Sequence, residues 1–363
     1  MLTILKLNAA QMTTIEVIDR RIDRLDELEE CTEALVSRQH NVLLYGSRGV
    51  GKTFLVKLIE ARIRESGCPL FPCIANVANV SLYGNSSASV ASSDDTSGFL
   101  RAILLQLCRS LWNLIGNKYL DLREQISDPP HLSDGPEASS IRRVFNLLMR
   151  LECSVSKSST GSIGVGAVIK GELKGESISE SHTMAILPFE FAEFVEELTV
   201  EVLQPRGYNR VVFLCDEANH MPLFCQEQLL DQCLDLFRGK GAQFLFVGGY
   251  LPIDGDPLLP ACFETMIELK GFHEKKHVRE LLSQCRINDC EFSDEAIDII
   301  YEAYAGHPRS SLLVADRAMR VDTGKMVSAN SVERAREEVD QQLKIEQFRI
   351  KTANSSHPRV TGQ

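Results

Sequence analysis

A glycine-rich segment near residue 50 constrains the fold of this 363-residue chain more than any other feature. It runs from Gly46 to Thr53 with the sequence GSRGVGKT, and it fits the pattern G-x-x-x-x-G-K-[ST] in full. An apolar run, residues 41–45, precedes it, and an apolar segment with helical spacing, residues 54–59, follows it. This order predicts a buried strand, then a loop that curls around an anion, then the start of a helix.

Each residue type in this segment suits the binding of phosphate. Gly46, Gly49 and Gly51 let the backbone turn so that successive N–H groups point inward. The helix that begins near Lys52 adds the positive end of its dipole at the same place. Lys52 is expected to reach the β- and γ-phosphates, and the Thr53 hydroxyl to be a ligand for Mg²⁺. The nucleotide-binding residues predicted here are Gly46, Ser47, Arg48, Gly49, Val50, Gly51, Lys52, Thr53 and Phe54. The alternative is a strand-to-helix turn that binds nothing.

A second stretch places two acidic residues at the end of an apolar run. Residues 210–215 have the sequence RVVFLC, and Asp216 and Glu217 follow. Such a run predicts a buried parallel strand that delivers its carboxylates to the carboxyl edge of the sheet, where ligands bind in open α/β sheets. Asp216 is expected to hold Mg²⁺ through water, and Glu217 to polarise the attacking water. Apolar runs before Asp-Glu are common, and the intact loop in the same chain is what favours this interpretation.

Apolar periodicity predicts the remaining elements. Three more strands are expected, at residues 68–76, 242–247 and 265–269. Helices are expected before the loop and between the strands, at residues 13–37, 99–114, 141–151, 189–203 and 226–237. After Gly271 the periodicity is helical throughout, at residues 274–285, 293–304, 308–319 and 331–349. The fold class predicted is α/β, with a parallel-sheet P-loop core, a C-terminal all-helical lid and a β-hairpin insertion.

These elements divide the chain into four predicted parts. They are an N-terminal helical lead-in (1–40), the P-loop core (41–271), the helical lid (272–349) and a flexible tail (350–363). Within the core, residues 153–184 alternate glycines with β-branched residues, which predicts a β-hairpin insertion. A flexible loop is the alternative for this segment.

Composition narrows the class of protein. Hydrophobic residues make up 44% of the chain and charged residues 25%, as in a soluble globular protein. A net charge of −11 disfavours coating of nucleic acid by the whole surface, and leaves a local basic patch open. No apolar run is long enough for a membrane span, and the N-terminus lacks the pattern of a signal peptide. Several of the 11 cysteines, including Cys108 and Cys215, lie in apolar runs, which favours buried free thiols and a cytoplasmic location over disulfides or structural zinc.

The order of these motifs resembles the AAA+ ATPases, and more narrowly their initiator-like branch of origin-recognition, transposition-helper and signalling ATPases. The resemblance covers residues 15–345 and implies ATP and Mg²⁺ as ligands and ATP-dependent assembly of a homo-oligomer. By position, residues 305–309 (AGHPR) match the family's G-x-P/A-R signature, which makes Arg309 the expected second sensor of the γ-phosphate. Asn76 or Asn79 matches the polar residue that restrains the catalytic glutamate.

The sequence also departs from that family. Gly248 and Gly249 stand where the first sensor normally has a polar side chain. Residues 260–264 contain no arginine at the place of the arginine finger, and Arg238 and Arg286 fit that place poorly. Too few residues follow the lid for a winged-helix DNA-binding domain. These departures favour a nucleotide-gated switch with slow turnover over a fast ring-shaped motor.

Three functions remain open on this sequence. The first is an ATP-binding, slowly hydrolysing switch that acts on DNA or on an effector protein through lid closure and assembly, with Glu217, Lys52 and Arg309 as catalytic residues. The second is a non-hydrolysing, nucleotide-dependent scaffold of a defence or signalling complex, against which the intact Glu217 argues. The third is a small-molecule kinase, against which the long helical lid argues.

Overall fold

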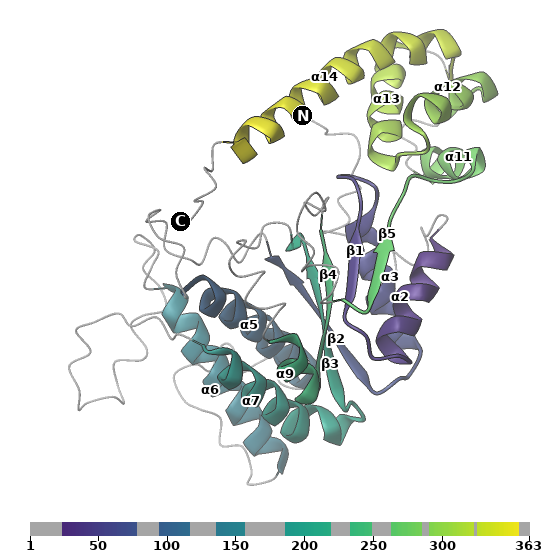
Figure 1. The fold of residues 1–363 in the computed structure, drawn as a ribbon. Coiled ribbons are helices and arrows are strands. Elements are labelled where there is room, and N and C mark those ends of the chain that lie inside the picture. Colours follow the sequence, from purple (N-terminus) through teal and green to yellow (C-terminus); the bar gives the residue numbers. More distant parts are fainter. Residues whose placement is uncertain are drawn as a thin grey trace. The chain divides into compact units, whose positions relative to one another are not determined.

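The structure is a computed structural model, and it describes residues 24–77, 94–116, 136–156, 186–218, 233–248, 263–284, 290–322 and 325–355 (Figure 1). Of the sequence predictions, Asn79, Gly249, Arg286 and most of the 153–184 insertion lie outside these residues. Contacts between Cα atoms group the chain into two units. The sheet unit comprises Asp26–Tyr45 and Ile59–Ile267, and the loop–helix unit comprises Met1–Leu25, Gly46–Leu58 and Glu268–Gln363.

A five-stranded sheet with the order β2-β3-β4-β1-β5 organises the sheet unit (Figure 1). Its strands are β1 (Val42–Tyr45), β2 (Leu70–Asn76), β3 (Arg210–Asp216), β4 (Ala242–Val247) and β5 (Thr265–Glu268). The pairs β1–β4, β4–β3 and β3–β2 are parallel, so the carboxyl ends of these four strands share one edge of the sheet. The predicted fold class is confirmed, with all five strands where the apolar runs placed them.

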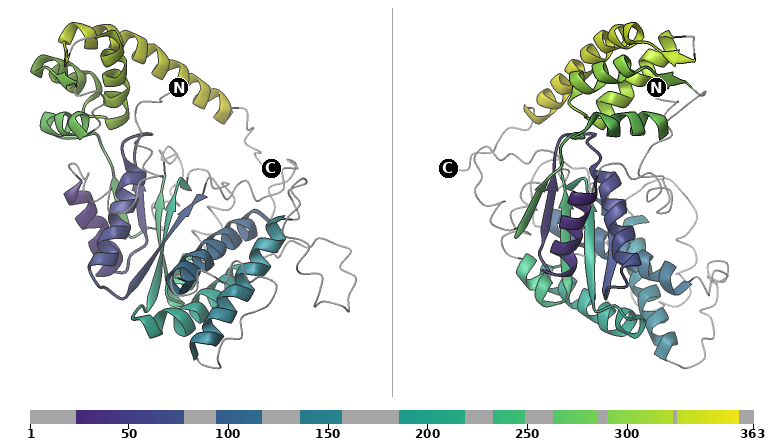
Figure 2. Two further views of the ribbon diagram at one scale, coloured as in Figure 1. Left: turned by 180° about the vertical axis from the view of Figure 1, so that it is seen from behind. Right: turned by 90° about the vertical axis from the view of Figure 1, so that its right-hand side faces the viewer.

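Helices cover the sheet and bury a large apolar core. They are α2 (Leu25–Val36), α3 (Lys52–Glu65), α5 (Asp94–Gly116), α6 (Pro136–Ser156), α7 (Pro188–Leu198) and α9 (Leu234–Gly239), with a π-helix η5 (Thr199–Leu203) and a 3₁₀ turn η6 (Gln204–Arg206) after α7. The α5 helix packs against α6, α7 and β2, and the three helices lie side by side in each view (Figure 2). Cys108 and Cys215 are free and buried in this core, as predicted.

Phenylalanine rings form the centre of that core. Phe213 on β3 stacks on Phe244 of β4 with ring centroids 5.1 Å apart, and Phe191 of α7 meets Phe237 of α9 at 5.0 Å. All four side chains are almost fully buried. Burial of one such ring contributes about 1.5–3 kcal/mol, so these contacts fasten α7 and α9 to β3 and β4.

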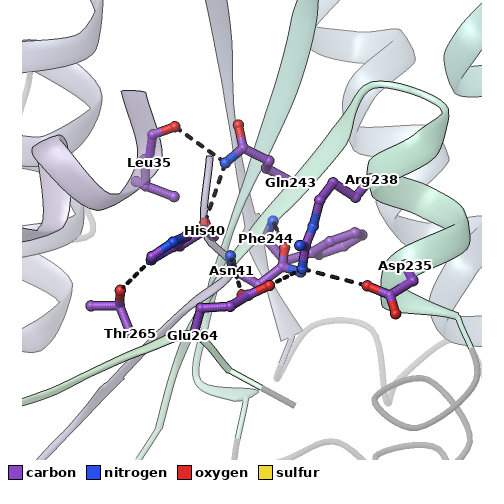
Figure 3. Close-up of polar contacts among 9 residues, drawn as sticks. All are labelled: Leu35, His40, Asn41, Asp235, Arg238, Gln243, Phe244, Glu264 and Thr265. Carbon is purple, nitrogen blue, oxygen red and sulfur yellow. Dashed lines mark hydrogen bonds and ion pairs between the residues drawn. The ribbon is translucent and has the colours of Figure 1, made fainter. Parts of the chain in front are cut away.

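A polar cluster, in which Asn41 and Gln243 are buried, lies at the amino ends of β1, β4 and β5 (Figure 3). We call it the amino-edge cluster, and its side chains are His40, Asn41, Asp235, Arg238, Gln243, Glu264 and Thr265. The Asn41 side-chain oxygen accepts a hydrogen bond from Phe244 N at 3.0 Å, which ties the start of β1 to β4. Gln243 Nε2 donates to the carbonyl oxygens of Leu35 and His40, each at 3.2 Å.

The same cluster fastens β5 on the other side of β1. Glu264, just before β5, accepts from Asn41 N at 2.9 Å and is ion-paired with Arg238 of α9. His40 Nδ1 lies 2.9 Å from the hydroxyl of Thr265. Because Asn41 and Gln243 are almost fully buried, these bonds stabilise one order of strands: a shift in register would leave buried polar groups without partners.

The C-terminal part of the loop–helix unit is mostly helical. It contains α11 (Lys275–Gln284), α12 (Asp294–Tyr304), α13 (Pro308–Val321) and α14 (Ala329–Ser355) around a core that includes Phe272, Ile297 and Val314. The Ser293 hydroxyl caps α12 by accepting from Ala296 N at 3.2 Å. Two short strands, β6 (Glu291–Phe292) and β7 (Met326–Val327), pair in parallel, which the sequence analysis did not predict. Within the described residues, no helix has the length and apolarity needed to cross a membrane.

Candidate nucleotide-binding site

The glycine-rich loop connects β1 directly to α3, so the strand, loop and helix follow in the predicted order. Gly49 has a φ of +88°, in the left-handed region that residues with a Cβ rarely adopt. A Cβ on Gly46 would lie only 2.4 Å from the carbonyl oxygen of Leu269, so no larger residue fits there without a shift of the backbone. Arg48 is exposed at the tip, Val50 is buried beneath the loop, and the half-buried Thr53 and Phe54 lie in the first turn of α3.

Lys52 folds back onto its own loop. Its Nζ donates hydrogen bonds to the carbonyl oxygens of Gly46 at 2.8 Å and Ser47 at 2.9 Å. The ammonium group is therefore held against the inside of the loop, at the amino end of α3, where the helix dipole is positive. A side-chain cation and a helix amino end at one place favour an anion, and phosphate is the anion for which this loop pattern is typical.

The start of α13 lies directly against the same loop. Arg309 N donates to Gly49 O at 3.3 Å, and a Cβ on Gly49 would lie 2.5 Å from both Cβ and Cδ of Arg309. His307 Nε2 lies 3.1 Å from the hydroxyl oxygen of Ser47. The structure thus places Arg309, the expected second sensor, beside the loop, and adds His307 as a second contact from the same signature.

Arg24 is a loop contact that the sequence analysis missed. Its Nη2 donates to Val50 O at 3.2 Å and to Lys270 O at 2.8 Å, and its guanidinium lies 5.0 Å from the centre of the Phe272 ring. The side chain is 4% exposed, which is rare for an arginine. An arginine on a predicted amphipathic helix carries no local signal of such a role, because its partners lie far away in the sequence.

The acidic pair ends β3 as predicted. Asp216 is buried, and its Oδ1 accepts a hydrogen bond from Glu217 N at 2.9 Å. Glu217 is exposed and has a φ of +57°, a conformation that costs a non-glycine residue about 1–3 kcal/mol and is enriched at functional sites. Asn76 lies opposite Asp216 in the β2–β3 register, and its buried side-chain oxygen has no hydrogen-bond partner among the residues that the structure describes.

Three neighbouring strands of the sheet unit end at the same edge. The strands β1, β4 and β3 are adjacent and parallel, so Tyr45, Val247 and Asp216 end at the carboxyl edge together. Gly248, directly after β4, donates its backbone N–H to Leu44 O at 3.1 Å and brings no side chain to this edge. In the contact grouping, the loop belongs to the loop–helix unit and the acidic pair to the sheet unit.

The oxygen donors predicted for a metal fit Mg²⁺ in kind. Thr53 offers a hydroxyl and Asp216 a carboxylate, and Mg²⁺ in nucleotide sites takes one or two protein ligands and keeps waters and phosphate oxygens for the rest. No group of three or more His, Cys, Asp or Glu side chains in the described ranges could hold a metal ion. Thr53 and Asp216 are each of a kind that could serve a metal whose other ligands are waters and phosphate oxygens.

Comparison with known proteins yields distant structural similarity only. No family model and no curated protein matches the sequence. Among solved structures, the chain is similar to the ORC1 protein of Aeropyrum pernix in complex with DNA, at 14% identity and a TM-score of 0.43, over 89% of this chain and 67% of that one. It is also similar to the RuvB Holliday junction branch migration motor of Thermotoga maritima, at 15% identity and a TM-score of 0.41, over 86% of this chain and 67% of that one. A third similar structure is PCH-2 of C. elegans, at 12% identity and a TM-score of 0.39, over 91% of this chain and 73% of that one.

The assignment of the fold rests on the chain itself, because the five-stranded sheet and the loop between β1 and α3 are observed in it. The fold is an α/β core with a glycine-rich loop between its first strand and the following helix, and a mostly helical C-terminal part follows it.

Proposed function

We propose that this chain binds ATP with Mg²⁺ at the glycine-rich loop and hydrolyses it slowly. One observation carries the proposal: Lys52 lies inside the loop, at the amino end of α3, with its Nζ on the carbonyls of Gly46 and Ser47. The Lys52 side chain can give up these two contacts and bind phosphate oxygens instead, without a movement of its backbone. An anion of the size of a polyphosphate would then meet the loop N–H groups, the lysine and the helix dipole together.

The chain's own residues have distinct roles in this proposal. Lys52 and the loop amides hold the β- and γ-phosphates, and Arg309 contacts the γ-phosphate from α13. Thr53 and Asp216 would each offer an oxygen to the metal, which when bound would neutralise charge on the phosphates. Glu217 orients and deprotonates the attacking water, for which its exposed position at the carboxyl edge of the sheet is suitable.

We further propose that the nucleotide acts as a switch on a macromolecular partner. Since α13 touches the loop through His307 and Arg309, a γ-phosphate at the loop would change those contacts and so move or fix α13 and the lid helices. The partner is DNA or an effector protein, and ATP-dependent assembly into a homo-oligomer would accompany the closed state. We expect the protein to act in the cytoplasm.

A second candidate function is a nucleotide-dependent scaffold that does not hydrolyse ATP. Gly248 favours it, because at the end of β4 this residue supplies no side chain to act as a first sensor. The positive φ of Glu217 favours the enzyme, because a scaffold would gain nothing from holding an acidic residue beside Asp216 in a strained backbone conformation.

Steady-state ATP turnover tests the proposal. We would compare the wild type with Glu217→Gln and with a matched control, Glu302→Gln, which removes a carboxylate from an exposed position on α12. Loss of a general base typically costs about 100-fold or more in rate, so turnover should fall by that factor in Glu217→Gln and stay unchanged in the control. Turnover that survives in Glu217→Gln, or is absent from the wild type despite bound nucleotide, would contradict the enzyme and favour the scaffold.

The same assays with and without duplex DNA separate the two kinds of partner. Stimulation by DNA, together with ATP-dependent assembly in size-exclusion chromatography, would support a DNA-directed switch. Phosphate contacts make such binding fall steeply with salt, which gives a second readout. Turnover that is indifferent to DNA would support an effector protein as the partner.

A further inference from the structure

The ring of His307 makes hydrogen bonds in two directions. On one side, Nε2 lies 3.1 Å from the hydroxyl oxygen of Ser47 in the loop. On the other side, Nδ1 accepts a hydrogen bond from Ser310 N at 3.3 Å, and the Ser310 hydroxyl lies 3.2 Å from the same nitrogen. His307 is therefore the N-cap of α13 and a loop contact at the same time.

These partners determine which nitrogen carries the proton. A backbone N–H can only donate, so Nδ1 must be unprotonated to accept from Ser310 N. The neutral ring then carries its hydrogen on Nε2 and donates it to the Ser47 oxygen. Because that oxygen accepts from the ring, the hydroxyl hydrogen of Ser47 is directed away from His307 and is available to another acceptor.

We propose that His307 is a positioning residue for nucleotide binding, which holds the Ser47 hydroxyl so that its hydrogen is donated to a phosphate oxygen, and which transmits occupancy of the loop to the first turn of α13. This inference rests on the nucleotide site proposed above and adds a residue to it. The loop and α13 are connected by two neighbouring contacts. His307 contacts Ser47 in the loop, and Arg309, two residues further along the chain, donates to Gly49 O.

The electrostatic surroundings keep the ring in the required neutral form. Burial lowers the pKa of His307 below its ordinary value, and the positive charges of Arg309 and Lys52 lower it further, while backbone hydrogen bonds at Arg48 and at His307 itself oppose the shift. Lys52 comes from α3 and Arg309 from α13, so both elements that face the ring disfavour a third positive charge. A protonated ring would also lose the cap on α13, because Nδ1–H cannot accept from Ser310 N.

Two substitutions separate the two bonds of His307. His307→Asn keeps the cap, since asparagine is among the best N-cap residues, and is too short to reach Ser47. His307→Gln places an amide N–H near the position of Nε2 and is the conservative variant for the loop contact. We would measure the affinity for Mg·ATP by isothermal titration calorimetry, and the thermal stability of each protein without nucleotide.

We expect His307→Asn to bind Mg·ATP about 3- to 10-fold more weakly, as for the loss of one hydrogen bond, with the melting temperature without nucleotide close to that of the wild type. His307→Gln should recover part of this loss. In a Ser47→Ala background, His307→Asn should cause no further loss, because the contact is already gone. Equal affinity of His307→Asn and the wild type, or the same loss with and without Ser47, would overturn the inference.

The outcome also distinguishes this inference from the function on which it rests. If the wild type binds no Mg·ATP, the nucleotide site fails and the role of His307 fails with it. If the wild type binds and the His307 variants bind equally well, only the role of His307 fails.

Discussion

The two ends of β1 carry polar groups that are used in opposite ways. In the amino-edge cluster before β1, a carboxylate meets a guanidinium at Glu264–Arg238, and the amides of Asn41 and Gln243 are bonded to backbone groups of neighbouring elements. In the loop after β1, the charged side chains that act on His307 are both cations, Lys52 and Arg309. The cluster pairs its charged groups with one another, whereas the loop carries positive charge from Lys52 and Arg309. The difference favours a structural role for the first region and the proposed anion-binding role for the second.

The largest effect on stability is expected from Gly46→Ala in the loop. The new Cβ would lie 2.4 Å from the backbone oxygen of Leu269, which cannot rotate away as a side chain can. Gly67→Ala is the matched control, because its φ of +63° is unfavourable for alanine but the space around it is open. Urea unfolding should show a loss of about 1–2 kcal/mol for the control and clearly more for Gly46→Ala. Equal losses would mean that the contact with Leu269 does not constrain the loop.

A smaller effect on stability is expected at the amino edge, with no effect on nucleotide binding. Gln243→Leu leaves the carbonyls of Leu35 and His40 without the amide that bonds them, which should cost about 1–3 kcal/mol. The control Gln341→Leu, at an exposed position on α14, should change stability by less than about 0.5 kcal/mol. Affinity for Mg·ATP, measured at a temperature where both variants are folded, should match the wild type. A fall in affinity for Gln243→Leu would break the separation between the two ends of β1.

The smallest effect is a pH dependence at His307. Because its pKa is lowered in the folded protein, the unfolded chain takes up the proton first as the pH falls below the ordinary value of 6.5. The stability that His307 contributes is therefore complete above that pH and is lost as the pH falls from 6.5 towards the folded-state pKa. Urea unfolding of the wild type and of His307→Asn across this range isolates the effect. The difference between their free energies of unfolding should shrink or reverse towards acid pH. A difference that stays constant with pH would contradict a lowered pKa of His307.

The sequence predicted the elements that depend on local pattern. Four- to seven-residue apolar runs gave β1, β2, β3, β4 and β5, and the G-x-x-x-x-G-K-[ST] pattern gave the loop between β1 and α3. The structure also placed Arg309 beside Gly49, where the resemblance expected a residue that reads the nucleotide. The strands and the loop could be predicted because periodicity and spacing encode them within a few neighbouring residues. The place of Arg309 was an expectation from the resemblance alone.

The rest depended on contacts between residues far apart in the chain. Arg24 meets Lys270, and Asn41 meets Phe244, across more than 200 positions in each case. The β6–β7 pair consists of two-residue strands, which are too short to show a period. The positive φ of Glu217 follows from how β3 ends, and no residue type in that stretch signals it.

The proposed function depends above all on the glycine-rich loop being an anion site for a nucleotide. The most direct test is calorimetric titration of Mg·ATP into the wild type and into Lys52→Ala, which removes the ammonium from the loop carbonyls and leaves the glycines in place. Hydrogen bonds to a charged group are worth about 1.5–3 kcal/mol each, so the variant should bind at least about 10-fold more weakly than the wild type, with an unchanged far-ultraviolet spectrum. Saturable binding by the wild type and its loss in Lys52→Ala is the predicted result. No binding by the wild type, or equal binding by both proteins, would contradict the account.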